Sequence, residues 1–174
     1  MTLAAMLLAA CPAWAQSVTP ANVPLGPGEE RVTEGTARLV SSLFAYVRWP
    51  ERPQPVRLCV AGPALYAGRI GSATIPGDGP IAVRTVAAGS PDEAASCDAL
   101  YVGGLNPAAT ARAIAAVRGR PVITIAENDP TCQSEAMFCL LYGADAISFR
   151  LNVDAVSRSA VRVDPRVLRM ARGQ

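Results

Sequence analysis

The sequence contains neither histidine nor lysine, and all sixteen of its basic residues are arginines. Without these two residue types the chain cannot form a Ser-His-Asp or Cys-His catalytic set, a zinc site with histidine ligands, a lysine Schiff base or a Walker A phosphate loop. The most common catalytic designs are therefore excluded, and we expect a protein that is not an enzyme and that uses no metal and no cofactor.

Charged and aromatic residues are also scarce. Charged residues make up 17% of the chain, aromatic residues 5%, and the net charge is +2. This basic excess, without lysines or interleaved aromatic residues, is too small for a nucleic-acid-binding protein. The apolar content of 51% argues against a disordered chain, and 174 residues suffice for one domain with a substantial core.

Residues 1–15 form a short apolar stretch that ends in Ala13-Trp14-Ala15. A small residue on either side of a variable one is typical of a secretory cleavage site, and the stretch is too short to span a bilayer. We therefore expect a signal peptide over residues 1–15, cleavage after Ala15, and an exported protein.

A second interpretation of this leader is a lipoprotein signal. Leu8-Ala9-Ala10-Cys11 resembles a bacterial lipobox, in which Cys11 would carry the lipid. Pro12, directly after the cysteine, suits this interpretation poorly, so it is the minority alternative.

Residues 16–30 are rich in proline and glycine and poor in apolar residues. Such a composition predicts a flexible, exposed arm. The folded domain is then expected over residues 31–174, with no internal repeat.

The remaining pattern predicts strands that alternate with helices. Apolar residues at three- and four-residue steps predict a helix over 36–49, which Pro50 ends. Asn106 and Pro107 have the types preferred at the N-cap and first position of a helix, here over 107–117. Further helices are expected over 64–70, 152–159 and 165–171, and strands over 56–61, 81–86, 99–102, 121–126, 136–142 and 146–151. This alternation predicts a single α/β domain with a mainly parallel sheet flanked by helices.

Four cysteines remain after the leader: Cys59, Cys97, Cys132 and Cys139. An even number in an exported chain predicts two disulfides as structural staples. Three pairings are allowed and the spacing decides only weakly among them, although Cys132 and Cys139 can close a short local loop. The last two cysteines lack the Cys-x-x-Cys spacing of thiol oxidoreductases.

A ligand site, if the fold has one, is expected at the carboxyl edge of the parallel sheet, where the strand-to-helix turns gather. The candidate binding residues there are Gly62, Gly103, Gly104, Asn106, Glu127 and Asp129. Because such turns need glycine for their geometry alone, the signal is weak. A hydrolase built on two carboxylates is a further alternative, with Glu127, Asp129, Glu135 and Asp145 as its candidates, but nothing in their spacing favours it over a solvated loop.

Several short blocks occur in an order that resembles the YfiR family of bacterial periplasmic proteins. They are Tyr-Val-Arg-Trp-Pro at the end of the first helix, Val-Arg-Leu-Cys-Val-Ala-Gly, Cys-Asp-Ala-Leu-Tyr-Val-Gly, Gly-Arg-Pro-Val-Ile-Thr-Ile-Ala-Glu, Phe-Arg-Leu-Asn-Val and Val-Leu-Arg-Met-Ala. The resemblance covers roughly residues 33–171.

The resemblance implies a non-enzymatic periplasmic regulator. Such a protein inhibits an inner-membrane diguanylate cyclase through the periplasmic domain of that cyclase, which lowers cyclic di-GMP and biofilm formation. An outer-membrane lipoprotein is a second partner that the resemblance implies, and a second copy of the chain is a candidate partner as well. A small-molecule-binding periplasmic protein is the alternative function.

The family pattern also implies roles for individual residues. It pairs Cys59 with Cys97 and Cys132 with Cys139. It places mainly structural residues at Trp49, Pro50, Phe149 and Asn152. The chain departs from the pattern at 135–138, where Glu-Ala-Met-Phe replaces the Gly-Gly-Met-Ile that is common in the family.

Overall fold

The computed structural model describes residues 23–28 and 30–171. The predicted signal peptide and Cys11 lie outside the described residues. The large sheet contains β1 (Val23–Pro24), β3 (Val56–Ala61), β4 (Thr74–Ile75), β5 (Gly79–Val86), β6 (Ala99–Val102), β7 (Ile123–Ala126), β8 (Phe138–Tyr142) and β9 (Ala146–Leu151). Its strand order is β1-β9-β8-β7-β6-β3-β5-β4, and β2 (Val47–Arg48) pairs separately with β10 (Arg162–Val163).

The centre of the large sheet is parallel. The neighbouring pairs β5 and β3, β3 and β6, β6 and β7, and β7 and β8 all run parallel. Antiparallel strands are added at both sides, with β9 and β1 beyond β8 and β4 beyond β5. Strands β8 and β9 form an antiparallel hairpin, and the predicted mainly parallel α/β fold is confirmed.

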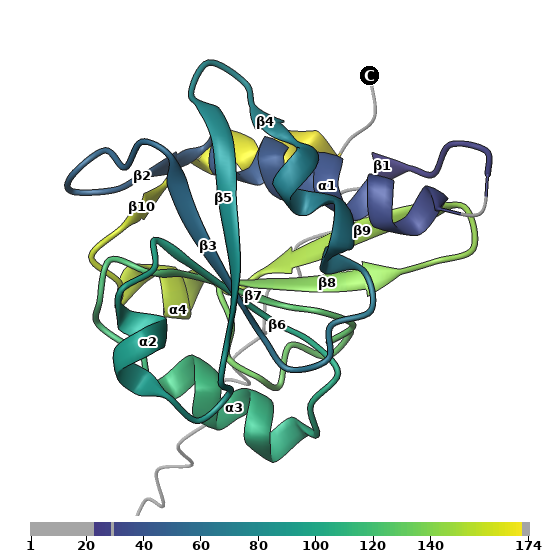
Figure 1. Ribbon diagram of the computed structural model, residues 1–174. Coiled ribbons are helices and arrows are strands. Elements are labelled where there is room, and N and C mark those ends of the chain that lie inside the picture. The colour runs from purple at the N-terminus through teal and green to yellow at the C-terminus, as the bar shows by residue number, and fades with distance from the viewer. Residues whose placement is uncertain (1–22, 29, 172–174) are drawn as a thin grey trace, which may run out of the picture.

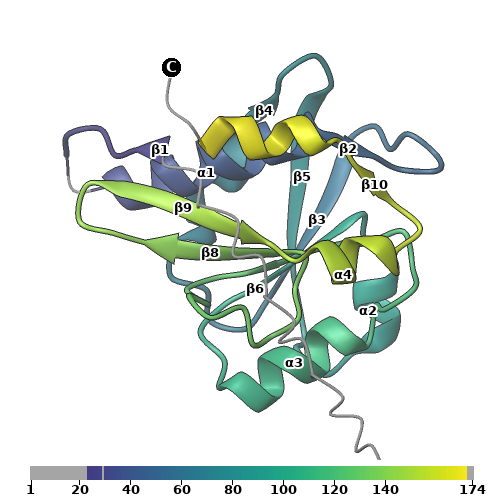
Figure 2. The ribbon, with the colours of Figure 1, turned by 180° about the vertical axis from the view of Figure 1, so that it is seen from behind.

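Helices cover the two faces of this sheet (Figures 1 and 2). One face packs against α1 (Arg31–Phe44) and the 3-10 helices η1 (Ala67–Ser72) and η2 (Pro165–Ala171). The other face packs against α2 (Pro91–Ala95) and α3 (Pro107–Ala115), while α4 (Val153–Ser157) follows β9.

Strand β3 shows why the core has two halves. Leu58 and Val60 point into the core on the α1 side, whereas Cys59 and Ala61 point into the core on the α2 and α3 side. Successive side chains of a strand point to opposite faces, so a central strand that is covered on both faces is apolar along its length.

The predicted helix over 36–49 is wrong at both ends. Helix α1 begins at Arg31 and ends at Phe44, and Val47 and Arg48 instead pair with Val163 and Arg162 as a short antiparallel ribbon. Pairing with residues distant in the sequence therefore makes residues 47–48 a strand, although the local spacing of apolar residues is that of a helix. The segment predicted as a helix over 64–70 is a 3-10 helix at Ala67–Ser72, and the one over 165–171 is likewise a 3-10 helix.

The predicted exposed arm over 16–30 is wrong for the part that the structure describes from Val23 to Leu25. Val23 and Pro24 pair with Ile147 and Ala146 of β9, and the Leu25 N–H donates a 2.8 Å hydrogen bond to the Asp145 carbonyl. Proline is tolerated here because this strand lies at the edge of the sheet and needs fewer donors.

Candidate functional site

Four of the predicted binding residues meet at the carboxyl edge of the parallel strands. Glu127 follows β7 directly, and its carboxylate reaches across to the turn that follows β3. Its Oε1 accepts a 2.8 Å hydrogen bond from the Leu65 N–H, and its Oε2 accepts a 2.9 Å bond from the Tyr66 N–H. Both carboxylate oxygens are therefore used to hold the 63–66 turn in place.

Gly62, Gly103 and Gly104 bring two turns into backbone contact beside this carboxylate. Gly62 has a φ of +84°, and a Cβ atom there would lie 2.3 Å from the Gly103 carbonyl oxygen. Gly104 has a φ of +67°, and its Cβ would lie 2.3 Å from the Pro63 carbonyl oxygen. These distances leave no room for a side chain, so glycine is required by both the backbone angle and the packing.

A buried tyrosine pair extends the Glu127 cluster into the core. The Tyr101 hydroxyl donates a 2.7 Å hydrogen bond to Glu127 Oε2 and lies 3.1 Å from the Tyr142 hydroxyl. Thr36 of α1 donates a 3.4 Å bond to the same Tyr142 oxygen. The cluster thus connects α1, β6, β7, β8 and the turn after β3.

Burial raises the pKa of Tyr101 well above its ordinary value, and the nearby Tyr142 and the Glu127 carboxylate add to this shift. Burial is also the main cause of the raised pKa of Tyr142. Both hydroxyl groups therefore stay protonated to a higher pH than an exposed tyrosine does, and the Tyr101 hydroxyl donates its proton in the hydrogen bond to Glu127.

Asn106 and Asp129, the other two predicted binding residues, use their side chains within their own segments. The Asn106 side chain caps α3 by accepting a 2.9 Å hydrogen bond from the Ala109 N–H, as the sequence predicts. Asp129 accepts hydrogen bonds from the backbone of Gln133 at 3.1 Å and Ser134 at 3.0 Å, which orders the loop before β8.

Replacing Glu127 with glutamine should lower the free energy of unfolding by about 1–3 kcal/mol. The glutamine amide keeps one acceptor oxygen, but its NH2 group then faces a donor whose hydrogen bond the carboxylate accepted. Glu135→Gln is the matched control, because Glu135 forms an exposed ion pair with Arg118 and its loss should cost less than about 1 kcal/mol. Urea unfolding of both variants tests this, and equal losses would contradict the assigned role of Glu127.

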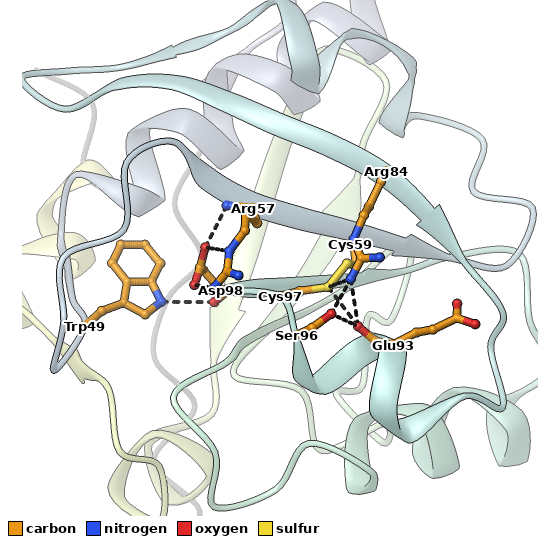
Figure 3. Close-up of polar contacts among 8 residues, drawn as sticks. All are labelled: Trp49, Arg57, Cys59, Arg84, Glu93, Ser96, Cys97 and Asp98. Carbon is orange, nitrogen blue, oxygen red and sulfur yellow. Dashed lines mark hydrogen bonds and ion pairs between the residues drawn. A yellow bond between two sulfur atoms is a disulfide. The ribbon is translucent and has the colours of Figure 1, made fainter.

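The amino ends of the parallel strands carry a second polar cluster, shown in Figure 3. Asp98 accepts hydrogen bonds from Arg57 Nε at 2.9 Å and Nη2 at 2.8 Å, and its Oδ2 also accepts the Arg57 backbone N–H at 2.8 Å. The Trp49 indole donates a 3.0 Å bond to the Asp98 carbonyl. This hydrogen bonding and the charge of Asp98 raise the pKa of the Arg57 guanidinium.

Two hollows flank Trp49 at this edge. One, of about 380 Å³, is lined by Trp49, Arg57, Asp98, Pro121 and the 50–53 segment. The other, of about 350 Å³, is lined by Ala45, residues 47–49, Arg52 and residues 76–78. The sequence does not predict this edge, because Trp49-Pro50 has the features of a helix end. The sequence feature that could have indicated this edge is Trp49, an aromatic residue followed closely by two prolines, Pro50 and Pro53.

Both predicted disulfide pairings are confirmed. Cys59 of β3 bonds to Cys97, two residues before β6, with a Cα–Cα distance of 6.0 Å. Cys132 bonds to Cys139 of β8 with a Cα–Cα distance of 5.4 Å. Arg84 of β5 lies over the first bridge, with its Nη2 at 3.3 Å from Cys97 Sγ and 3.0 Å from the Glu93 carbonyl (Figure 3).

Asp129, Cys132 and Cys139 lie close enough together to suggest a metal site, since one potential ligand atom of each falls within 4.8 Å of the others. The two sulfur atoms are bonded to each other, however, and a metal needs a cysteine as the free thiolate. This cluster is therefore the disulfide loop and not a metal centre.

Three of the four residues that the family pattern marks as structural lie in packed or capping positions, and the fourth, Pro50, is exposed. The Phe149 ring meets Phe138 edge to face with centroids 5.5 Å apart, and Trp49 meets Phe44 in the same way at 5.8 Å. Asn152 caps α4 through a 3.0 Å bond from the Ala155 N–H. Pro50 lies in the wall of the larger hollow.

Comparison with protein-family models finds a match over residues 33–172 to the family described as YfiR/HmsC-like. The match extends from within α1 through η2 and includes both disulfides and both edge clusters. In the part of the chain that the structure describes, none of the helices has the length and apolar character needed to cross a membrane.

Proposed function

Because the chain belongs to the YfiR/HmsC-like family, a family of periplasmic regulators of diguanylate cyclase signalling, we propose that it inhibits an inner-membrane diguanylate cyclase. It binds the periplasmic domain of that enzyme and so lowers cyclic di-GMP and biofilm formation. An outer-membrane lipoprotein is its second partner and relieves the inhibition by sequestering it. The observation that carries this proposal is the family match over nearly the whole described domain.

The chemistry of the chain supports a binding role over a catalytic one. The sequence offers no histidine and no lysine as a general base or nucleophile, and the best-placed carboxylate, Glu127, is held by three hydrogen bonds. Two disulfides hold the surface in one arrangement. A preorganised surface loses less conformational entropy when it binds a partner.

A clean deletion in the host tests the proposal. We expect the deletion to raise cyclic di-GMP and the full-length gene to restore the original level. The matched control is the same gene lacking residues 2–15, which should fail to restore it because the product is not exported. Unchanged cyclic di-GMP, with no membrane partner recovered by cross-linking, would overturn the proposal and favour the ligand-binding alternative.

Export is expected to proceed with cleavage after Ala15, which leaves Gln16 as the mature N-terminus. Intact-mass measurement of the protein recovered from the periplasm checks this directly. An acylated N-terminal Cys11 would instead establish the lipoprotein alternative and tether the domain to a membrane.

The hollow of about 380 Å³ beside Trp49 supports small-molecule binding as a second candidate function. Its walls are partly apolar and partly charged, as is usual for ligand sites. After removal of the leader Trp49 is the one tryptophan of the chain, so its fluorescence reports on the edge of the sheet where this hollow lies. A saturable change in that fluorescence with a periplasmic metabolite, without any membrane partner, would favour this function.

A further inference from the structure

Strand β9 has an outer edge that β1 covers only in part. Figure 2 shows β1 at the hairpin end of β9, where it pairs with Ala146 and Ile147. Strand β9 continues from there to Leu151. In the part of the chain that the structure describes, no strand pairs with the outer edge of residues 148–151.

The hydrogen bonds between β8 and β9 show which backbone groups face this edge. The Gly143 N–H donates a 2.9 Å bond to the Ala146 carbonyl, and the Asn152 N–H likewise donates to the β8 side. In an antiparallel pair, bonded and non-bonded residues alternate along each strand, so the even-numbered residues of β9 bond to β8. The N–H and C=O groups of Phe149 and Leu151 therefore point to the uncovered edge.

Phe149 makes this edge costly to leave uncovered. Only 2% of the residue is exposed, and buried backbone N–H and C=O groups are almost always hydrogen-bonded. Among the described residues, no backbone hydrogen bond outside the helices and strand ladders involves Phe149 or Leu151. The outward groups of these two residues therefore need a partner from elsewhere.

The register of β1 shows which segment of the chain points along this edge. Val23 lies opposite Ile147, and the Leu25 N–H donates a 2.8 Å bond to the Asp145 carbonyl. The odd-numbered residues of this segment therefore bond to β9, and the even-numbered residues direct their backbone groups away from it.

Continuing the same register toward the N-terminus covers the rest of β9. Ala21 would lie opposite Phe149, in a bonded position. Thr19 would lie opposite Leu151, also in a bonded position. Strand β9 ends at Leu151, so residues 19–22 suffice to cover the whole edge.

The prolines of this segment fit that pattern. Proline has no N–H and is tolerated in an edge strand where its nitrogen points away from the ladder. Pro24 already occupies such a position, opposite Ala146. Pro20 has the same phase, whereas Thr19 and Ala21 on either side of it have the N–H groups that bonded positions require.

We propose that residues 19–22 continue β1 along this edge, so that the arm after the leader closes the edge of the domain's own sheet. The backbone of this segment then pairs with the outward groups of Phe149 and Leu151. Asn22 lies opposite Ser148, and two polar side chains in that position can hydrogen-bond each other. Both interpretations of the leader leave this segment on the mature chain.

The contacts of β1 favour this segment over a strand from another protein. A Cβ atom on Gly35 of α1 would lie 2.7 Å from Leu25 Cδ2, so Leu25 packs directly against the helix. Arg38 Nη2 donates a 3.4 Å bond to the Pro24 carbonyl. These contacts hold Val23 at the start of the uncovered edge. Pairing of the adjoining residues is then intramolecular, which gives them a high effective concentration.

Amide hydrogen exchange of the purified protein lacking residues 1–15, followed by NMR, tests the proposal. We expect the N–H groups of Phe149 and Leu151 to be protected. Ala21→Pro should speed their exchange roughly 10-fold or more, because it removes a donor from the ladder and places a proline ring against β9. Asn22→Pro is the matched control and should have a far smaller effect, because the backbone N–H of residue 22 points away from β9.

The register has its own test in engineered disulfides. Asn22→Cys and Ser148→Cys together should form a disulfide on air oxidation, because the Cα atoms of a non-bonded antiparallel pair lie about 4.5 Å apart. Asn22→Cys with Arg150→Cys is the control, since residues in that diagonal position lie roughly 7–8 Å apart, too far for a bridge. Non-reducing peptide mapping identifies the bridges.

Three results would overturn the proposal: unprotected Phe149 and Leu151 amides in the wild type, equal effects of the two proline variants, or a disulfide that forms as well with residue 150 as with residue 148. Protection that appears only after a cyclase periplasmic domain is added would assign the edge to that partner and equally refute the proposal. Because the exchange and disulfide tests use the protein alone, their outcome is separate from that of the proposed inhibition.

Discussion

Replacing both Cys59 and Cys97 with serine is expected to lower the free energy of unfolding by about 4 kcal/mol, against about 2.5 kcal/mol for the same change at Cys132 and Cys139. The first bridge closes a segment with a sequence separation of 38, the second one of only 7. A longer loop gains more freedom in the unfolded chain when its bridge is lost, so its removal costs more.

The first bridge also ties together the centre of the fold. Cys59 lies in β3, the neighbour of both β5 and β6, and it is fully buried, while Cys97 is nearly so. A loss of about 4 kcal/mol is a large part of the stability of an ordinary domain. Urea unfolding of the two double-serine variants measures both losses. If the Cys132 and Cys139 variant were the less stable of the two, the chain-entropy explanation would be wrong for this protein.

Gly62→Ala is expected to destabilise the domain by more than about 3 kcal/mol, through backbone strain and a steric clash together. Gly62 has a φ of +84°, and a Cβ would lie 2.3 Å from the Gly103 carbonyl oxygen and 2.7 Å from Leu105 Cγ. A backbone carbonyl cannot move aside as a flexible side chain can. The two turns would have to separate, which would also disturb the bonds that Glu127 makes to the 63–66 turn.

Gly119→Ala separates the two causes of this loss. Gly119 has a similar φ of +77°, but a Cβ there would meet no atom within 4 Å. The control should therefore cost only about 1–2 kcal/mol, which is the strain of the left-handed backbone alone. Chemical denaturation of both variants gives the difference, and similar losses would show that the close approach of Gly62 and Gly103 contributes little.

The sequence predicts three of the strands with their bounds, because their signal is local. The strands over 56–61, 99–102 and 146–151 have the predicted bounds, since their apolar residues are buried and the turns beside them contain glycine or aspartate. The end of α1 could not be predicted in this way. Val47 and Arg48 form a strand only because residues 162–163, more than a hundred positions later, supply the partner.

The residues that make up the candidate site could be predicted from the sequence, but the hydrogen bonds that they form could not. The rule that turns gather at the carboxyl edge of a parallel sheet brings Gly62, Gly103, Gly104 and Glu127 together, as observed. That rule does not reveal that two backbone N–H groups and a tyrosine occupy the Glu127 carboxylate. The hollows beside Trp49 depend on residues 76–78 and Pro121, which reach this edge only through the folded sheet.

The buried tyrosine pair bears on how many protons the protein exchanges when it folds. The sequence lacks histidine and lysine, and the four cysteines of the described residues are bonded in pairs, so no side chain there normally titrates between about pH 5 and pH 9. Stability depends on pH only where the folded and unfolded states bind different numbers of protons.

Above about pH 10 the two states do differ, because the unfolded chain loses its tyrosine protons while Tyr101 and Tyr142, whose pKa values are raised, keep theirs. Stability therefore falls as the pH rises through that value.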